Sequence, residues 1–210
     1  MPDDAAAIAL PRPPAVRARH AASLLVVRTG QAGPEVLMGV RGGRHRFMPH
    51  KLVFPGGAVD RADLVAPAAS PLSALTRARL ERAANPALAH AIGIAAAREL
   101  TEETGLSLGD PPALAALQYL CRMITPPAYP IRFNARFLLV GAEHVGGTLA
   151  GSGELEGLRF LGLDEALGCD LAEPQRRVIE RLPAWLAMSE TARAAETRLP
   201  VFRRRAWGQE

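Results

Sequence analysis

The sequence predicts an α/β fold in which a mixed β-sheet lies between layers of helices. Two apolar segments near the amino terminus have the composition of neighbouring strands, a long helix follows, and further strands and a closing helix complete the order. Elements in this order bury their apolar faces as helices packed on both faces of a sheet. The chain has 210 residues, of which 49% are hydrophobic, so one domain with a substantial core is expected.

Composition along the chain sets the expected domain limits. Residues 1–19 are rich in proline and are expected to form an irregular leader. The main domain is expected over residues 20–190, with an insertion at about 64–87. Residues 191–210 are expected to form a carboxy-terminal tail.

Residues 21–28 and 35–41 are rich in apolar and β-branched residues and are predicted to be the first two strands. Gly30 and the pair Gly33-Pro34 mark the turn between them. The other predicted elements are a helix at about 88–104, strands at 131–140 and 158–161, and a helix at 174–188 that is broken near Pro183.

The insertion at 64–87 is predicted to be helical and to lie on the surface. Ser70-Pro71 has the pattern of a helix start, and Asn85-Pro86 has that of a stop before the next helix. Its leucines are too few to define a deep core face: Leu72, Leu75 and Leu80. We therefore expect a surface helix or helical hairpin that serves either as a lid over the substrate or as a homodimer contact.

The net charge of +4 arises almost entirely from arginine, because Lys51 is the only lysine. Arginine remains charged to high pH, so the pI of 9.8 reports arginine usage rather than a strong basic field. Residues 203–205 (RRR) are expected to be solvated rather than to hold phosphate. A nucleic-acid partner is therefore not expected.

Several features lead us to expect a cytoplasmic protein. No apolar run approaches the roughly 18 residues that a membrane-spanning helix needs. The amino terminus begins with the acidic letters MPDD, unlike a secretory signal, and the final letters WGQE are not a peroxisomal address. Cys121 and Cys169 are too few for a disulfide scaffold and are expected to be reduced, buried thiols.

Three glutamates of the helix predicted at 88–104 fall on one face. At about 100° of rotation per residue, Glu99, Glu102 and Glu103 lie within an arc of roughly 100°. Carboxylates this close repel one another, so we expect a cation among them. Oxygen ligands without His or Cys suit Mg²⁺ or Mn²⁺. The alternative is a solvated acidic face, but small and apolar residues cover the rest of this helix and leave the carboxylates where it surfaces.

Residues 98–106 (RELTEETGL) resemble the second half of the Nudix box. Residues 54–63 (FPGGAVDRAD) resemble its first half, with Asp63 where the family usually has Glu. Thirty-four residues separate Asp63 from Arg98, more than the box usually has. The resemblance covers roughly residues 20–185 and implies a Nudix-type α/β/α sandwich with a helical insertion.

A subgroup that resembles the peroxisomal coenzyme A diphosphatases also carries a long insertion inside the box. Arg41, Arg46 and the block 47–54 are similar to that subgroup. Two positions differ from it, because its members usually have Ser where Gly42 stands and Gly where His50 stands.

The family resemblance implies metal-dependent hydrolysis of a diphosphate linkage. Glu102 and Glu103 are the first choices as metal ligands and Glu99 is the third. The backbone carbonyl of Gly57 is the fourth by resemblance, since a backbone that approaches an ion tolerates no side chain. Arg98 lies close enough to orient a glutamate, and we favour a structural salt bridge as its role.

The general base and the phosphate contacts are less defined by the sequence. Glu154 and Glu156 lie on a glycine-flanked loop, and either is a candidate base, although a carboxylate that binds the metal can also suffice. The candidates for phosphate contact are Arg41, Arg46 and Arg136, each of which is otherwise a surface arginine.

Three functions are compatible with these residues. The first is a coenzyme A or acyl-coenzyme A diphosphatase, and the second is a diphosphatase for ADP-ribose or a nucleotide sugar. The third is a non-catalytic nucleotide sensor with the same fold, which we rank last because all three carboxylates are retained. In each case the partner is a small nucleoside diphosphate derivative.

Overall fold

The computed structural model describes residues 16–43 and 50–210 of the chain. The central strands of its sheet are β1 (Arg19–Gly30), β2 (Gly33–Arg41), β6 (Gln118–Ile124) and β7 (Phe133–Gly141). The strands beside them are β3 (Leu52–Val53), β4 (Gly56–Ala58), β9 (Leu155–Gly162), β10 (Pro200–Arg203) and β11 (Ala206–Gln209). These nine strands of the described ranges form one sheet in the order β11-β10-β6-β7-β1-β2-β3, with β4 paired to β1 and β9 to β2.

The sheet is mixed, as predicted. Strand β1 runs parallel to β7 and antiparallel to β2, and β10 runs parallel to β6. In the middle of β1, Leu24, Leu25 and Val26 are fully buried, which is the pattern of a strand covered on both faces. The strands predicted at 21–28 and 35–41 are confirmed as β1 and β2.

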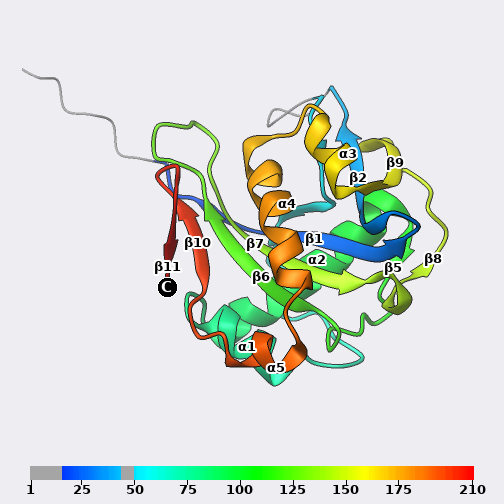
Figure 1. Ribbon diagram of the computed structural model, residues 1–210. Coiled ribbons are helices and arrows are strands. Elements are labelled where there is room, and N and C mark those ends of the chain that lie inside the picture. Colours follow the sequence, from blue (N-terminus) through cyan, green and yellow to red (C-terminus); the bar gives the residue numbers. More distant parts are fainter. Residues whose placement is uncertain (1–15, 44–49) are drawn as a thin grey trace, which may run out of the picture.

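Helices cover both faces of this sheet. They are α1 (Ala74–Glu81), α2 (Pro86–Thr104), α3 (Leu163–Gly168), α4 (Glu173–Leu186) and α5 (Glu190–Ala195). Figure 1 shows α4 in front of the sheet and α2 behind it. Side chains of β1 alternate between two cores, because Leu24 packs in the cluster that contains Ile92 of α2, whereas Leu25 packs in the cluster that contains Ile179 of α4. The predicted α/β/α sandwich is confirmed.

Short elements connect these layers. They are two 3₁₀-helices, η1 (Ala62–Leu64) and η2 (Ala142–His144), and two paired strands, β5 (Leu106–Ser107) and β8 (Gly146–Gly147).

Helix α2 has a clear start and stop in the sequence. The side chain of Asn85 accepts a hydrogen bond of 2.8 Å from the Leu88 N–H, and Pro86 follows in the first turn. The pair Asn85-Pro86 therefore begins α2. At the other end Gly105 adopts φ 73°, and its N–H donates to the Thr101 carbonyl at 3.0 Å.

The inserted segment differs from its prediction in two ways. Its helix begins at Ala74 with Ser73 as the capping residue, whereas Ser70 forms a bridge with Ala113 and starts no helix. Leu72 and Leu80 are buried in the core on the α2 side. The few apolar side chains of the insertion are enough for it to join the core, because burial of one face of one short helix suffices.

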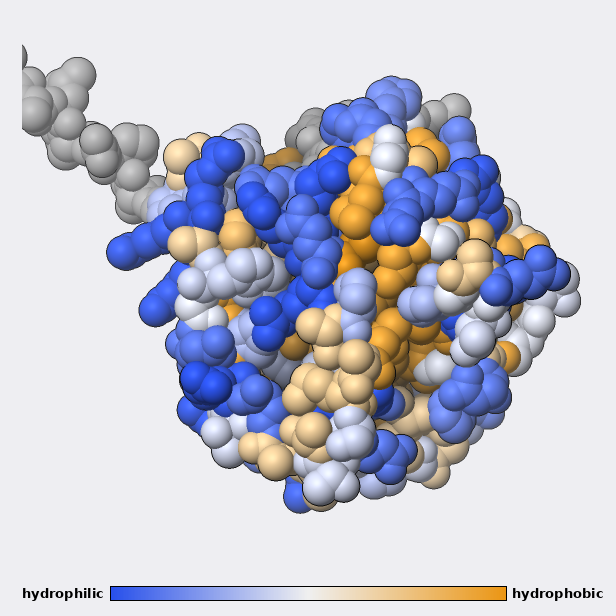
Figure 2. All heavy atoms as spheres, viewed as in Figure 1, coloured by the Kyte–Doolittle hydropathy of each residue, from blue (hydrophilic) through white to orange (hydrophobic). Residues whose placement is uncertain are grey.

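The carboxy-terminal half also differs from its prediction. Helix α4 continues through Pro183, since Val178, Ile179, Leu182 and Trp185 place one apolar stripe against the sheet across that position. Figure 2 shows hydrophilic residues where α4 faces the solvent and a strip of hydrophobic residues beside it.

Residues 191–210 do not form a separate tail. They complete α5 and add β10 and β11 to the sheet, where Val201 lies beside Arg122 of β6 and is buried. Strand β6 and helix α3 were not predicted.

Two further expectations concern compartment and membrane. Both cysteines are free; Cys121 is buried, whereas Cys169 is partly exposed. Within the described ranges, none of the helices combines the length and the hydropathy that crossing a bilayer would require.

We expect Leu80→Ala to destabilise the protein by about 2–5 kcal/mol, because it removes a buried side chain from the core and leaves a cavity. Leu80 is 1% exposed, whereas Leu75 of the same helix is 39% exposed. Leu75→Ala is therefore the matched control and should change the free energy of unfolding little. Equal, small effects of the two variants in chemical denaturation would show that the insertion lies outside the core.

Candidate metal and catalytic site

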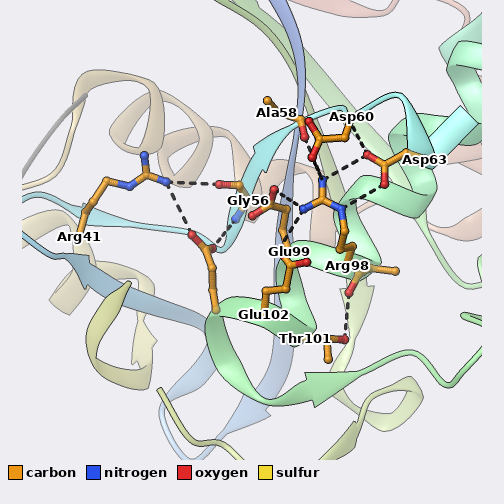
Figure 3. A network of polar contacts seen from close by, with 11 residues as sticks. Arg41, Gly56, Ala58, Asp60, Asp63, Arg98, Glu99, Thr101 and Glu102 are labelled. Carbon is orange, nitrogen blue, oxygen red and sulfur yellow. Dashed lines mark hydrogen bonds and ion pairs between the residues drawn. The ribbon is translucent and has the colours of Figure 1, made fainter. Parts of the chain in front are cut away.

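The end of α2, strand β4 and the 3₁₀-helix η1 meet at one place. Helix α2 carries Arg98 and the three glutamates in its last two turns, β4 crosses beside it with Gly56 and Gly57, and η1 supplies Asp63. Figure 3 shows the Arg98 guanidinium at the centre of this group, with carboxylates on both sides. The fold thus joins the two sequence segments that the insertion separates.

Arg98 is held from both sides. Its Nε and Nη2 donate to the two oxygens of Asp63 at 3.1 and 3.2 Å, and Nη2 also donates to the Ala58 carbonyl at 3.0 Å. Its Nη1 donates to Glu99 at 2.8 Å and to Glu102 at 3.0 Å. Burial alone would lower the pKa of Arg98, but the bonds to Asp63 and the charge of Glu99 outweigh it and raise that pKa.

Asp63 fixes the orientation of the Arg98 guanidinium. It is 2% exposed, and its second oxygen also accepts from the Asp60 N–H at 2.8 Å. A planar guanidinium held by two bonds to one carboxylate has a fixed orientation. Arg98 thus forms salt bridges to Asp63, Glu99 and Glu102, and a purely structural role for it stays a prediction. The role of Asp63 was not predicted, although its place in the first half of the box was a signal.

Glu103 faces the other way and is nearly inaccessible, with 1% of its surface exposed. It accepts a hydrogen bond of 2.8 Å from the Gly56 N–H and lies 3.7 Å from Arg41. Burial raises the pKa of its carboxyl to about 8, because the Gly56 bond and the Arg41 charge only partly offset the loss of water. Burial likewise raises the pKa of Glu99.

Two glycines let β4 approach these side chains. A Cβ on Gly57 would lie 2.2 Å from a Glu99 oxygen. Gly56 adopts φ 153°, and a Cβ there would lie 2.4 Å from the Ala22 carbonyl. A side chain at Gly56 would be strained and would meet the backbone of β1, whereas one at Gly57 would displace the Glu99 carboxylate.

The chemistry of this site fits a hard divalent cation. Glu99, Glu102 and Glu103 supply only carboxylate oxygens, which Mg²⁺ and Mn²⁺ prefer. Burial raises the pKa of Glu99 and of Glu103, and the nearby charges of Arg98 and Arg41 only partly offset it. In the described parts of the chain, no three acidic, His or Cys side chains are gathered closely enough to hold a metal ion. The ligand set therefore remains a prediction.

The two candidate bases differ in their surroundings. Glu154 is exposed, and its charge raises the pKa of both Glu99 and Glu103, so it lies within electrostatic reach of the site. Glu156 begins to pair with β2 opposite Val40, and its carboxylate lies near Gly42. Which of the two acts as a base stays a prediction.

The three arginines predicted to contact phosphate have separate outcomes. Arg41 lies at the site: it donates to the Gly56 carbonyl at 3.3 Å, and its buried Nε has no hydrogen-bond partner among the described residues. Arg46 lies outside the described residues. Arg136 is 1% exposed and donates to the Asn134 and Ala83 carbonyls at 3.0 and 2.7 Å, so it links β7 to the insertion instead of reaching a phosphate.

A pocket of about 230 Å³ adjoins the carboxylate site. Arg41, Gly56 and Gly57 form one end of it, and most of the remaining wall is apolar. The loop after β6, the start of β7, the first turn of α4 and the end of β10 enclose it. None of its lining residues comes from the insertion, so the structure gives the insertion no place as a lid over this pocket.

We expect the metal-free protein to lose stability as pH rises from about 5 to about 8 through ionisation of Glu103. Folding raises the pKa of this carboxyl from 4.5 to about 8, so between these values the folded state keeps a proton that the unfolded chain releases. The stabilisation is complete below pH 4.5 and is lost as pH passes about 8. Unfolding in a chelator should show a smaller fall for Glu103→Gln than for the wild type.

The exposed Glu143 provides the matched control, and Glu143→Gln should follow the wild-type pH dependence. Mg²⁺ or Mn²⁺ should reduce the loss in the wild type by favouring the ionised carboxylates. If the free energies of unfolding of the wild type and of Glu103→Gln depend on pH in the same way, the pH dependence does not arise from Glu103.

Comparisons with known proteins place this geometry in context. No family profile matches the sequence, and no curated protein sequence matches it. Solved structures do match: a Nudix hydrolase from Alicyclobacillus acidocaldarius has 25% identity and a TM-score of 0.62, over 80% of this chain and 92% of that one. A MutT Nudix hydrolase from Burkholderia pseudomallei has 21% identity and a TM-score of 0.53, over 80% and 99%.

The Nudix domain of Shewanella oneidensis NrtR has 15% identity and a TM-score of 0.50, over 82% of this chain and 90% of that one. Together these structures share the mixed sheet and its helices with the present chain. The similarity to the Alicyclobacillus enzyme, joined to the carboxylate site at the end of α2, supports placing this chain in the Nudix hydrolase superfamily as a diphosphatase enzyme.

Proposed function

We propose that this protein hydrolyses the diphosphate linkage of a nucleoside diphosphate derivative with the help of Mg²⁺ or Mn²⁺. One observation carries the proposal: Arg41, Gly56 and Gly57 belong both to the carboxylate network and to the wall of the pocket. A ligand in the pocket would therefore lie beside residues that contact the carboxylates.

The residues suit attack of water at phosphorus. A diphosphate carries concentrated negative charge, and a bound divalent cation would neutralise part of it. Glu99, Glu102 and Glu103 would hold that cation, together with the Gly57 carbonyl. Arg41 can donate to a phosphate oxygen through the Nε that has no partner in the described chain. Glu154, whose charge acts on Glu99 and Glu103, would accept a proton from water.

We propose coenzyme A or an acyl-coenzyme A as the substrate. Such a ligand needs positive charge for its 3′-phosphate and a wall along its pantetheine arm. Arg41 and Arg205 supply charge at the pocket, and Thr125 and Pro126 form part of its wall. A cytoplasmic location remains part of this proposal.

ADP-ribose or a nucleotide sugar is the second candidate. One observation supports it: the insertion does not line the pocket, so it adds no wall for a long pantetheine arm, which ADP-ribose lacks. The Shewanella Nudix domain was solved with ADP-ribose. Both candidates use the same carboxylates and differ only in what the pocket receives.

We expect Glu103→Gln and Glu102→Gln to lower turnover by about 1,000-fold or more, because each removes a charge that the cation needs. Steady-state rates at saturating Mg²⁺ and circular dichroism on the same samples test this. Glu143→Gln keeps the same chemistry at an exposed position away from the site and should retain activity. Near wild-type turnover of Glu103→Gln with an intact fold would remove Glu103 from the metal site.

A substrate panel separates the two candidates. With Mg²⁺ or Mn²⁺, coenzyme A should yield 3′,5′-ADP and 4′-phosphopantetheine, identified by mass spectrometry. The comparison is the ratio kcat/KM for coenzyme A, ADP-ribose and a nucleotide sugar under the same conditions. A higher ratio for ADP-ribose would assign the second function and leave the metal site unchanged.

A further inference from the structure

One polar side chain in the pocket has no role in the chemistry described above. Gln175 lies in the first turn of α4, lines the pocket and is 8% exposed. Its amide oxygen Oε1 is buried and has no hydrogen-bond partner among the described residues. A buried acceptor without a donor is unfavourable, so the amide gains a hydrogen bond if it turns toward a ligand that brings an N–H group into the pocket.

The walls around Gln175 suit a flat, apolar ring. Phe133, Phe137 and Phe202 line the pocket, with Pro126 and Pro174 beside them. Aromatic faces stack favourably on planar groups. The volume of about 230 Å³ suits one ring system of a substrate rather than the whole of it.

The position of the pocket fixes which part of the substrate enters. Arg41 and Gly57 at one end connect it to the carboxylates, where the diphosphate belongs, whereas Gln175 comes from α4 on the other side of the sheet from α2. The group that reaches Gln175 is therefore joined to the diphosphate through a spacer. A nucleoside base joined through its ribose has this form.

We propose that the pocket holds the purine base of the substrate and that Gln175 determines base specificity. The Gln175 oxygen accepts a hydrogen bond from the 6-amino group of adenine, an edge that a glutamine amide can match with an acceptor and a donor together. This inference rests on the proposed function only in taking a nucleotide as ligand. Coenzyme A and ADP-ribose both carry adenine, so it holds for either.

The test is a double-mutant cycle between protein and ligand, measured by calorimetry on the full chain. The ligands are adenosine 5′-monophosphate and purine riboside 5′-monophosphate, which lacks the 6-amino group; neither contains a diphosphate to cleave. The wild type should bind the adenosine compound about tenfold more tightly. Gln175→Leu should reduce this preference to about twofold or less, with the loss confined to the adenosine compound.

Gln118 provides the matched control, because its amide oxygen already accepts a bond of 3.2 Å from Arg193, and it does not line the pocket. Gln118→Leu should keep the tenfold preference. Gln175→Met preserves the length of the side chain and replaces Gln175→Leu if that variant does not fold. With whichever substrate is cleaved, the Gln175 variants should raise KM and leave kcat within about twofold.

The outcomes separate this inference from the proposed function. If the protein prefers the adenosine compound because of Gln175 but cleaves no diphosphate, the base pocket is supported and the proposed hydrolase function is overturned. Diphosphate cleavage by a protein whose Gln175 variants keep the full preference would support the function and overturn the base pocket. If the wild type does not bind the two monophosphates or does not distinguish them, the base pocket is also overturned.

Discussion

The pairing of Arg98 with Asp63 is the interaction on which the rest of the site depends. Asp63 is almost completely buried, and a buried carboxylate without its partner costs about 3–5 kcal/mol. The same guanidinium bonds Glu99, Glu102 and the backbone of β4. One side chain thus ties together the start of the insertion, the glycine strand and the carboxylate helix.

This network also explains how an exposed and a buried carboxylate occur side by side in one site. Glu102 remains more than half exposed, whereas Glu103 is buried against Gly56 and Arg41. The exposed carboxylate can be hydrated without a cation, and the buried one can keep its proton instead. The protein can therefore fold before a cation binds. The carboxylates lie near a pocket that is lined by the loop after β6, by α4 and by β10.

The sequence predicted the features that depend on local periodicity. Strands β1 and β2 and the carboxylate helix follow from residues close together in the chain, whereas the mixed sheet was predicted from the order of the elements and the family resemblance. Features that depend on distant contacts were missed: β10 is a strand because β6 lies beside it, and Arg136 is buried because Ala83 accepts its bond. Gln175 shows no signal in the sequence, since only the folded chain brings its amide into an apolar pocket.

The bond from Arg136 to the Ala83 carbonyl bears on how the insertion can vary among proteins of this kind. The contact uses a backbone oxygen, so it makes no demand on which side chain stands at position 83. Substitutions there can accumulate while the segment keeps its attachment to the central sheet. Arg136, by contrast, also contacts His20 and Asn134, and almost any replacement would leave several partly buried acceptors without this donor.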